Sequence, residues 1–224
     1  MDKIAAIVSL LNKAKNQSTV FVEQITMIKH KKSASKSSGK GQIRIIAGTH
    51  RGRRLPVLLA DGLRPTTDRV KETVFNWLMP YLPEAKCLDC FAGSGGLGFE
   101  ALSRGAKKVT MVELHKPAAQ QLKANGKTLK ADNLTVANTD ALSFLTTATE
   151  QFDLVFLDPP FRQNLIEKSA NLLNQGWLAE QALIYVEMES ELSEQTLLPS
   201  NWQLLKEKTA GQVSYRLYQT TNAN

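Results

Sequence analysis

Four consecutive residues combine the groups that a protein needs to hold a flat molecule by an amine: Asp158, Pro159, Pro160 and Phe161. They follow residues 154–157, an uninterrupted apolar run that is typical of a strand buried on both faces of a parallel sheet. Ligands of such sheets bind at the carboxyl ends of the strands. An aspartate, a carbonyl group held rigid by two prolines and an aromatic ring at that place predict a pocket for a planar group with an exocyclic amine.

The chemistry that this arrangement favours is nucleophilic attack by the amine. The lone pair of an aromatic amine is delocalised into its ring, which makes the nitrogen a poor nucleophile. Two acceptors, the Asp158 carboxylate and the Pro159 carbonyl, would take its two N–H bonds and favour a pyramidal nitrogen. The ring of Phe161 would stack on the planar group, and such stacking on a nucleic-acid base is worth about 1–3 kcal/mol in comparable sites. The simpler alternative is a turn without chemistry, because Asp-Pro commonly opens turns.

A glycine-rich loop lies upstream, between a predicted strand at 87–91 and a predicted helix that ends near Arg104. Residues Gly93–Gly98 match G-x-G-x-x-G, in which the glycines let the backbone turn tightly and approach a ligand. Glu113 comes twenty residues after Gly93, at the end of the next predicted strand, where a carboxylate can bind ribose hydroxyls. These features predict a nucleotide cofactor, but they do not separate NAD from S-adenosylmethionine (SAM).

The elements that must position these residues alternate between strand and helix. This order predicts an α/β fold with a mostly parallel seven-stranded sheet and helices on both faces. Residues 202–209 and 213–219 flank a turn and predict an antiparallel hairpin at one edge. Residues 42–60 predict a smaller hairpin followed by a helix. The parallel strands are expected at 87–91, 109–112, 134–137, 154–157 and 182–188.

Positive charge is concentrated near the beginning of the chain. The 224 residues carry a net charge of +7, and nine basic residues but no acidic one lie between Met27 and Ala60. The remainder has 19 basic residues against 21 acidic ones. A basic arm of this kind neutralises phosphates and predicts nucleic-acid binding, although a solvated tail is the plain alternative for residues 29–40.

Nothing in the sequence predicts a membrane span or a metal site. No run reaches about 18 uninterrupted apolar residues, and no small-residue cleavage site follows the short apolar segment 4–11, so we expect a cytoplasmic protein. Cys87 and Cys90 form a C-x-x-C pair, but it lies in a predicted strand, and the three histidines offer no ligand spacing. Small buried residues are the better interpretation of the pair, and no metal is expected.

Two motifs together resemble those of known methyltransferases. Residues Asp89–Gly95 have the form D-x-F-x-G-x-G and resemble motif I of the class I enzymes, which use SAM. Asp158–Phe161 resembles the catalytic motif of amino-methyltransferases, and a dehydrogenase has no need of it. The resemblance implies a Rossmann-like class I methyltransferase fold with SAM as cofactor. It also implies these cofactor-binding residues: Arg64, Thr66, Asp89, Phe91, Gly93, Ser94, Gly95, Glu113, Leu114, Asp140 and Ala141.

Further stretches make the resemblance specific, and it extends over about residues 42–220. They resemble the RsmD family of bacterial 16S rRNA guanine-N2 methyltransferases: Arg44–Gly48, Arg51–Pro56, Leu63–Val70, Leu88–Ala106, Asp158–Arg162 and Ala210–Arg216. The resemblance implies methylation of one guanine N2 in 16S rRNA, within the small subunit or an assembly intermediate. We expect a monomer. The predicted RNA-binding residues are Lys40, Arg44, Arg51, Arg53, Arg54, Arg69 and Arg162.

Other functions fit part of the same pattern. An adenine-N6 methyltransferase of DNA or RNA could use the same four residues, because adenine also has an aromatic amine. A glutamine-amide methyltransferase more often has Asn in place of Asp158, and its peptide substrate would leave the basic arm unexplained. A non-catalytic RNA-binding protein of ribosome assembly would need no set of acidic residues at the ends of successive strands.

The chain is expected to contain one folded domain behind an extension. Residues 1–41 predict a flexible basic extension, and Met27 is a hypothetical native start that would make residues 1–26 an upstream addition. Residues 42–224 predict a single SAM-dependent methyltransferase domain, in which 42–60 form the RNA-binding hairpin.

Overall fold

The computed structural model describes residues 40–58, 68–192 and 197–221 of the chain, which belong to one structural unit, Gly39–Asn224. Almost all of the predicted extension 1–41 lies outside the described residues, and its flexibility and native start stay predictions. The predicted cofactor residues Arg64 and Thr66 lie outside them as well.

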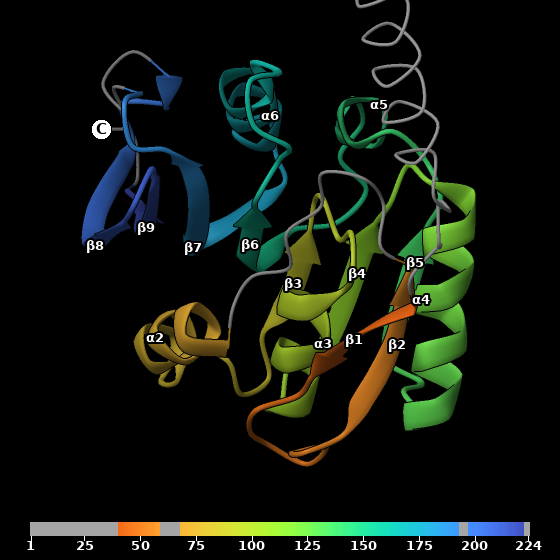
Figure 1. Ribbon diagram of the computed structural model, residues 1–224. Helices are drawn as coiled ribbons and strands as arrows, with labels where there is room; N and C mark the ends of the chain where they lie inside the picture. Colours follow the sequence, from red (N-terminus) through yellow and green to blue (C-terminus); the bar gives the residue numbers. More distant parts are fainter. Residues whose placement is uncertain (1–39, 59–67, 193–196, 222–224) are drawn as a thin grey trace, which may run out of the picture. The chain divides into compact units, whose positions relative to one another are not determined.

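Seven strands form one sheet in the spatial order β5-β4-β3-β6-β7-β9-β8 (Figure 1). Strands β3 to β7 of this sheet are parallel, and β9 and β8 add an antiparallel edge. The predicted sheet and terminal hairpin are therefore confirmed. The strand bounds are β3 Lys86–Asp89, β4 Lys108–Val112, β5 Leu134–Ala137, β6 Phe152–Leu157, β7 Leu178–Glu189, β8 Trp202–Ala210 and β9 Val213–Thr220.

The chain order reverses direction in the middle of this sheet. From β3 the chain moves outward to β4 and β5, and it then returns to place β6 on the other side of β3. A ligand crevice is expected outside the carboxyl ends of the strands at such a switch point. The strand predicted at 182–188 is longer, because Leu178 also pairs with Phe152 before the register shifts between Phe152 and Leu154.

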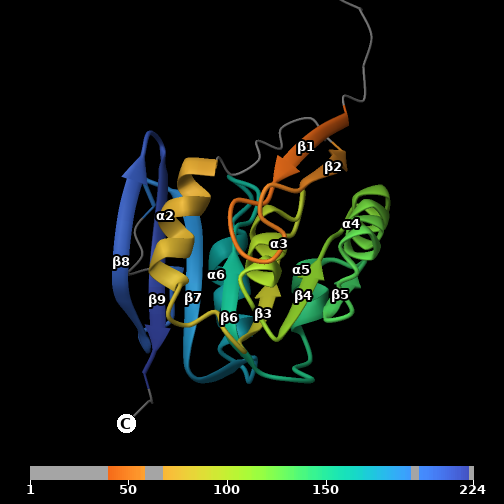
Figure 2. The same cartoon turned by 90° about the horizontal axis from the view of Figure 1, so that it is seen from below.

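Helices cover both faces of the sheet, as predicted (Figure 2). The residues of α2, α3 and α4 pack in one apolar cluster, and those of α5 and α6 pack in a second cluster on the opposite face. Their bounds are α2 Asp68–Leu78, α3 Gly96–Ser103, α4 Lys116–Leu129, α5 Ala141–Leu145 and α6 Leu165–Leu173. Within the described residues, no helix combines the length and the apolar character that crossing a membrane requires.

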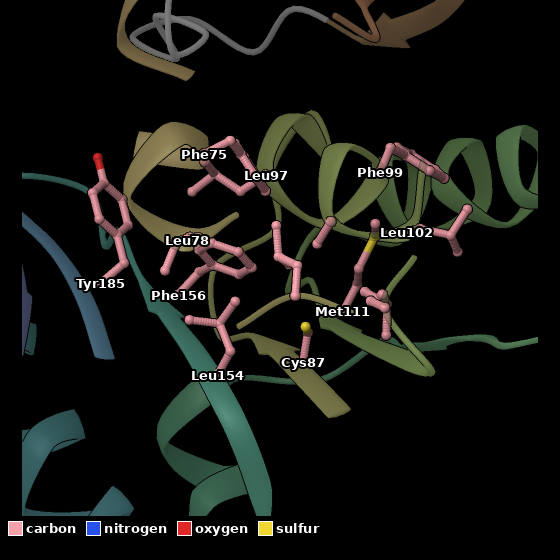
Figure 3. Close-up of a cluster of buried hydrophobic side chains, with 14 of the residues drawn as sticks. Phe75, Leu78, Cys87, Leu97, Phe99, Leu102, Met111, Leu154, Phe156 and Tyr185 are labelled. Atoms are coloured by element: carbon pink, nitrogen blue, oxygen red, sulfur yellow. The ribbon is translucent and has the colours of Figure 1, made fainter. Parts of the chain in front are cut away.

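Strand β6 is apolar on both sides because both of its faces are covered. Leu154 and Phe156 point into the cluster under α2 and α3 (Figure 3), whereas Val155 and Leu157 belong to the opposite cluster. Every one of these four side chains is almost fully buried. The sheet therefore holds the residue that follows β6 on a rigid support.

The C-x-x-C pair is structural. Cys87 and Cys90 are buried free thiols, and they belong to opposite apolar clusters, so their side chains lie on different faces of the sheet. Burial raises the pKa of both thiols well above the ordinary value. No group of three or more metal-ligating side chains occurs in the part of the chain that the structure describes.

The predicted N-terminal hairpin forms a separate two-stranded sheet, β1 Lys40–Arg44 with β2 Arg54–Leu58. Its apolar side packs into the same cluster as α2, α3 and α4 through Ile43, Leu55 and Val57. The turn between the strands lies against the last residues of α3, because Thr49 N–H donates to the carbonyl oxygen of Ser103 at 2.7 Å.

Two glycines of this turn offer a matched test of that contact. Gly48 and Gly52 have φ angles of 80° and 82°, but a Cβ atom on Gly48 would overlap the backbone carbonyl of Ser103, whereas one on Gly52 would meet nothing within 4 Å. Gly52→Ala should lower the free energy of unfolding by about 1–2 kcal/mol, the left-handed backbone term alone. Gly48→Ala should cost about 1–3 kcal/mol more because of the overlap. Urea unfolding measures the free energy of unfolding of both variants. Equal decreases would show that the turn at Gly48 is not in close contact with the end of α3.

Candidate active site

Acidic side chains gather where the central parallel strands end. Asp89 is the last residue of β3, Asp158 follows β6, and Glu187 lies near the end of β7. Asp89 pairs in register with Phe156, and Leu157 pairs with Val186, so the three positions are neighbours across the sheet. Side chains alternate along a strand. Asp158 and Glu187 therefore lie on the sheet face that carries Phe156 and Tyr185, the face beneath α2 and α3.

Asp89 supports the glycine loop from below. Its side chain is only 2% exposed, and its Oδ2 accepts a hydrogen bond from Gly98 N–H at 3.2 Å. Burial raises the pKa of Asp89 to about 7, although hydrogen bonds from the N–H groups of Gly98 and Phe91 favour the charged form. A cation placed beside it would further favour the carboxylate.

The glycine loop turns sharply from β3 into α3. Gly93 and Gly95 have φ angles of 51° and 80°, and Gly95 N–H donates to the carbonyl of Ala92 at 2.6 Å. A Cβ atom on Gly95 would lie 2.6 Å from side-chain atoms of both Phe99 and Leu122. These glycines are thus required by the turn and by close packing beneath it, while Phe91, Gly93 and Ser94 keep part of their surface exposed.

Glu113 is held against the glycine loop. Its Oε2 accepts from Gly93 N–H at 2.9 Å, and its Oε1 accepts from His115 N–H at 2.7 Å. The Asn138 amide donates to the carbonyl oxygens of Glu113 and Leu114 at 2.8 and 3.0 Å. A carboxylate has about four acceptor positions, so both oxygens can still bind hydroxyl groups. Leu114 is 65% exposed beside them, where an apolar ligand face could rest.

Asp140 begins a helix next to this strand end. Its Oδ1 accepts from Ser143 N–H at 2.8 Å, which caps the first turn of α5. Ala141 is the first residue of that helix, and an N–H group at this position has no partner within the helix. Asp140 thus caps α5 and keeps part of its surface exposed, whereas Ala141 is buried.

The Asp158–Phe161 element leaves the sheet as a rigid loop. Asp158 is partly exposed, Pro159 is buried, and Phe161 is 39% exposed, so its ring is accessible to a ligand. Arg162 has a φ angle of 61°, and its N–H donates to Glu189 Oε1 at 2.6 Å. Glu189 on β7 thus fixes the end of this loop.

Asp158 and Glu187 form an acidic pair. Burial raises the pKa of Asp158 well above its ordinary value, and the charges of Glu187 and Asp89 raise it further. Burial also raises the pKa of Glu187, although a hydrogen bond from the Tyr185 hydroxyl at 2.9 Å favours its charged form. The site therefore holds two carboxylates that repel each other and that protein donors satisfy only in part.

Three of these supporting residues are not predicted from the sequence: Asn138, Glu187 and Glu189. Glu187 gave a signal, because it is a charged residue directly after the apolar strand residues 182–186, at the edge where ligands bind. Asn138 stands in the same position after residues 134–137. Glu189 gave none, because its contact with Arg162 depends on a loop fold that no spacing reveals.

The predicted RNA-binding residues do not form one group. Arg51 lies in the hairpin turn, which contacts the C-terminal end of α3, whereas the glycine loop is at the N-terminal end of that helix (Figure 1). Arg53 and Arg54 follow it and are exposed, although Arg53 also donates to the carbonyl of Thr128 at 3.3 Å. Arg162 is exposed directly after the Asp158–Phe161 element.

The other three lie on two other elements, β1 and α2. Lys40 and Arg44 are the first and last residues of β1, and the side chain of Arg44 is exposed. Arg69 is exposed in the first turn of α2. The predicted RNA-binding residues thus extend from the hairpin to the loop after β6, and among them Arg162 is close in sequence to Asp158.

Comparison with known proteins gives a consistent result. The family model described as "Conserved hypothetical protein 95" matches residues 43–219. The chain is 58% identical over 183 residues to ribosomal RNA small subunit methyltransferase D of Escherichia coli strain K12, which covers 81% of this chain and 92% of that protein. It is 59% identical over 187 residues to the protein of that name in Haemophilus influenzae, covering 81% and 96%.

Solved structures agree with these matches. A structure described as a putative methyltransferase yhhF from Escherichia coli has a TM-score of 0.74 at 57% identity and covers 80% of this chain and 98% of that chain. A putative methyltransferase complexed with SAH has a TM-score of 0.62 at 17% identity, covers 83% and 57%, and shows the fold alone.

The predicted Rossmann-like class I methyltransferase fold is confirmed by these structures, and so is the predicted family. On the match of 43–219 and on identities near 58% over four fifths of its length, the chain belongs to the family of ribosomal RNA small subunit methyltransferase D.

Proposed function

We propose that this protein transfers a methyl group from SAM to the N2 amine of one guanine in 16S rRNA of the small ribosomal subunit. The observation that carries the proposal is the position of Asp158–Phe161 at the switch point of the sheet, one strand away from the Asp89–Gly95 loop. Membership of the small-subunit rRNA methyltransferase D family supports the choice of substrate.

The residues at the strand ends fit SAM by their chemistry. Asp89 would face the cationic methionine end, a buried carboxylate whose raised pKa a cation would lower. Glu113 would bind the ribose hydroxyls, and Asp140 with the N–H of Ala141 would bind the adenine edge. Leu114 would lie against the adenine. When bound, SAM supplies a methyl group on a positively charged sulfur, which an amine can attack.

Asp158 and Pro159 would prepare the acceptor amine. Two acceptors on its two N–H bonds hold the nitrogen in place and free its lone pair from the ring, and the exposed ring of Phe161 stacks on the base. Correct alignment of amine and methyl group can supply up to about 7–11 kcal/mol. The methylated amine is a strong acid, so its proton leaves to Asp158 or to water without a strong base.

The guanine must leave its stack to reach this site. Its N2 amine lies on the Watson–Crick edge, so we propose that the base is extruded from RNA held within the subunit or an assembly intermediate. Basic side chains of the hairpin would bind phosphates of the same RNA. We propose a monomer, because one copy of the chain supplies every group named here, and a cytoplasmic protein, because the proposed substrate is ribosomal.

The identity of the product tests the proposal most directly. Purified protein, labelled SAM and small subunits from cells that lack the enzyme should give label in one nucleoside, N2-methylguanosine, after digestion and chromatography. Label in N6-methyladenosine would replace the acceptor by adenine, the main alternative. SAM binding without any labelled nucleoside would favour the non-catalytic RNA-binding alternative.

A pair of substitutions tests the role of Asp158. Asp158→Ala removes one of the two acceptors and should lower kcat by roughly 10²–10³-fold, the loss seen when one oriented polar partner of the reacting group is removed. Asp158→Asn keeps an acceptor oxygen and should retain more activity than the alanine variant. SAM affinity by calorimetry should stay within a few-fold in both. Near-normal turnover of Asp158→Ala would contradict the proposed role.

Salt dependence tests the hairpin arginines. The triple variant of Arg51, Arg53 and Arg54 to Ala should bind substrate RNA with a slope of log Kd against log salt that is shallower by about 2, since each lost phosphate contact contributes about 0.7 to 0.9. The matched control replaces three exposed lysines on α6 and β8, Lys168, Lys206 and Lys208. Equal slopes for the two triple variants would contradict RNA binding by the hairpin turn.

A further inference from the structure

A second carboxylate stands beside Asp158 without a place in the proposed function. Leu157 pairs with Val186, so the next residues along the parallel strands, Asp158 and Glu187, lie side by side at the carboxyl edge. Both belong to the sheet face that carries Phe156 and Tyr185. Both keep part of their surface exposed, so a ligand at the site can reach them.

Tyr185 fixes one end of the Glu187 carboxylate. Its buried ring packs edge-on against Phe156 with centroids 6.2 Å apart, and Figure 3 shows its hydroxyl at the outer end, away from the strand. That hydroxyl donates to Glu187 Oε2 at 2.9 Å. The other oxygen, Oε1, keeps its capacity to accept a donor from a ligand.

We propose that Glu187 determines the specificity for guanine by accepting the N1–H bond of the base, while Asp158 and Pro159 hold the N2 amine. This inference rests on the proposed function, because it assigns a second contact to the same acceptor. It makes Glu187 a binding residue of the acceptor pocket and Tyr185 the residue that positions it.

The two purines differ in the group that this carboxylate would meet. Guanine presents two adjacent donors, N1–H and the N2 amine, and so matches two neighbouring carboxylates. Adenine presents a donor amine next to N1, which has a lone pair and no hydrogen. A carboxylate opposite that lone pair loses its hydrogen bond and meets an acceptor, and sites of this kind reject an analogue that lacks the expected hydrogen.

The charges around the pair agree with this assignment. Asp158 and Glu187 repel each other, and Asp89 from β3 adds to the negative potential, whereas β7 contributes the neutral hydroxyl of Tyr185. Two such carboxylates are relieved by donors placed between them. Guanine supplies those donors, so binding it lowers the cost of keeping both groups charged.

A base analogue separates this contact from the rest of the site. 2-Aminopurine keeps the N2 amine but has a lone pair at N1. Small subunits are reconstituted with 2-aminopurine at the guanine that wild-type enzyme labels, and kcat/KM is compared with guanine. Wild-type enzyme should lose roughly 10²-fold or more on the analogue. The Gln amide of Glu187→Gln can turn to donate to N1 of the analogue. For this variant, kcat/KM on 2-aminopurine should therefore be less than about 10-fold below kcat/KM on guanine.

Control variants show whether the effect belongs to Glu187. Tyr185→Phe keeps the Glu187 carboxylate but removes the hydrogen bond that orients it. Its loss of kcat/KM on 2-aminopurine should lie between that of wild type and that of Glu187→Gln. Glu191→Gln removes an exposed charge close by on the chain and should show the wild-type penalty. Equal penalties in wild type and Glu187→Gln would overturn the inference alone. Wild-type transfer to adenine would overturn both it and the proposed function.

The pH profile gives an independent measurement. Glu187 raises the pKa of Asp158, and the charged pair is the form that accepts guanine, so kcat/KM should fall as the pH drops through that raised pKa. Removing the neighbouring charge in Glu187→Gln should move this acidic limb to lower pH, whereas Glu191→Gln should leave it in place. An unmoved limb in Glu187→Gln would show that the Glu187 charge does not act on Asp158, against the proposed acidic pair.

Discussion

Burying a carboxylate costs free energy unless hydrogen-bond donors replace the water that it loses. Four buried or partly buried carboxylates, Glu100, Asp89, Asp158 and Glu187, differ in how many donors the protein gives them. Glu100 on α3 is fully buried, yet it accepts from the N–H groups of Ile46 and Ala47 at 2.8 and 3.0 Å and from the Arg104 guanidinium at 2.8 Å. It thereby ties the N-terminal hairpin to the helix that begins at the glycine loop. Breaking such a pair on one side leaves a buried charge without compensation.

The buried carboxylates that hold the fold together accept more hydrogen bonds from the protein than the carboxylates at the reactive centre do. Glu100 has three protein donors, and Asp89 has the N–H groups of the loop that it supports. Glu187 accepts a hydrogen bond from the Tyr185 hydroxyl, and the charges of Asp158 and Glu187 repel each other. A site that is built to bind donors must leave acceptors incompletely satisfied in the free protein. The raised pKa values of Asp158 and Glu187 are thus what is expected of carboxylates that are buried to accept hydrogen bonds from an amine of the substrate.

The sequence predicted the sheet, the two-sided burial of 154–157 and the terminal hairpin, because each depends on a local pattern of apolar residues and turns. It also placed Asp89, Glu113 and Asp158 at strand ends, since motif and strand end coincide in this fold, but it did not single out Asn138 or Glu187. It could not predict Glu100 or Glu189 as supports, because their partners come from segments 54 and 27 residues away that only the packed structure brings together. Asp158 and Glu187 become neighbours through strand register, which a single apolar run does not specify.

The separation of the hairpin turn from the glycine loop bears on the shape of the substrate. The turn contacts the C-terminal end of α3 and the glycine loop forms its N-terminal end, so eight helical residues, about 12 Å, lie between them. An extruded base alone cannot reach both places. A folded RNA can, because its backbone continues on either side of the base that enters the pocket. Glu100 keeps this separation fixed, since it holds the hairpin to α3 from within the core. A substrate that contacts the basic turn as well as the pocket must therefore extend beyond the base that reacts.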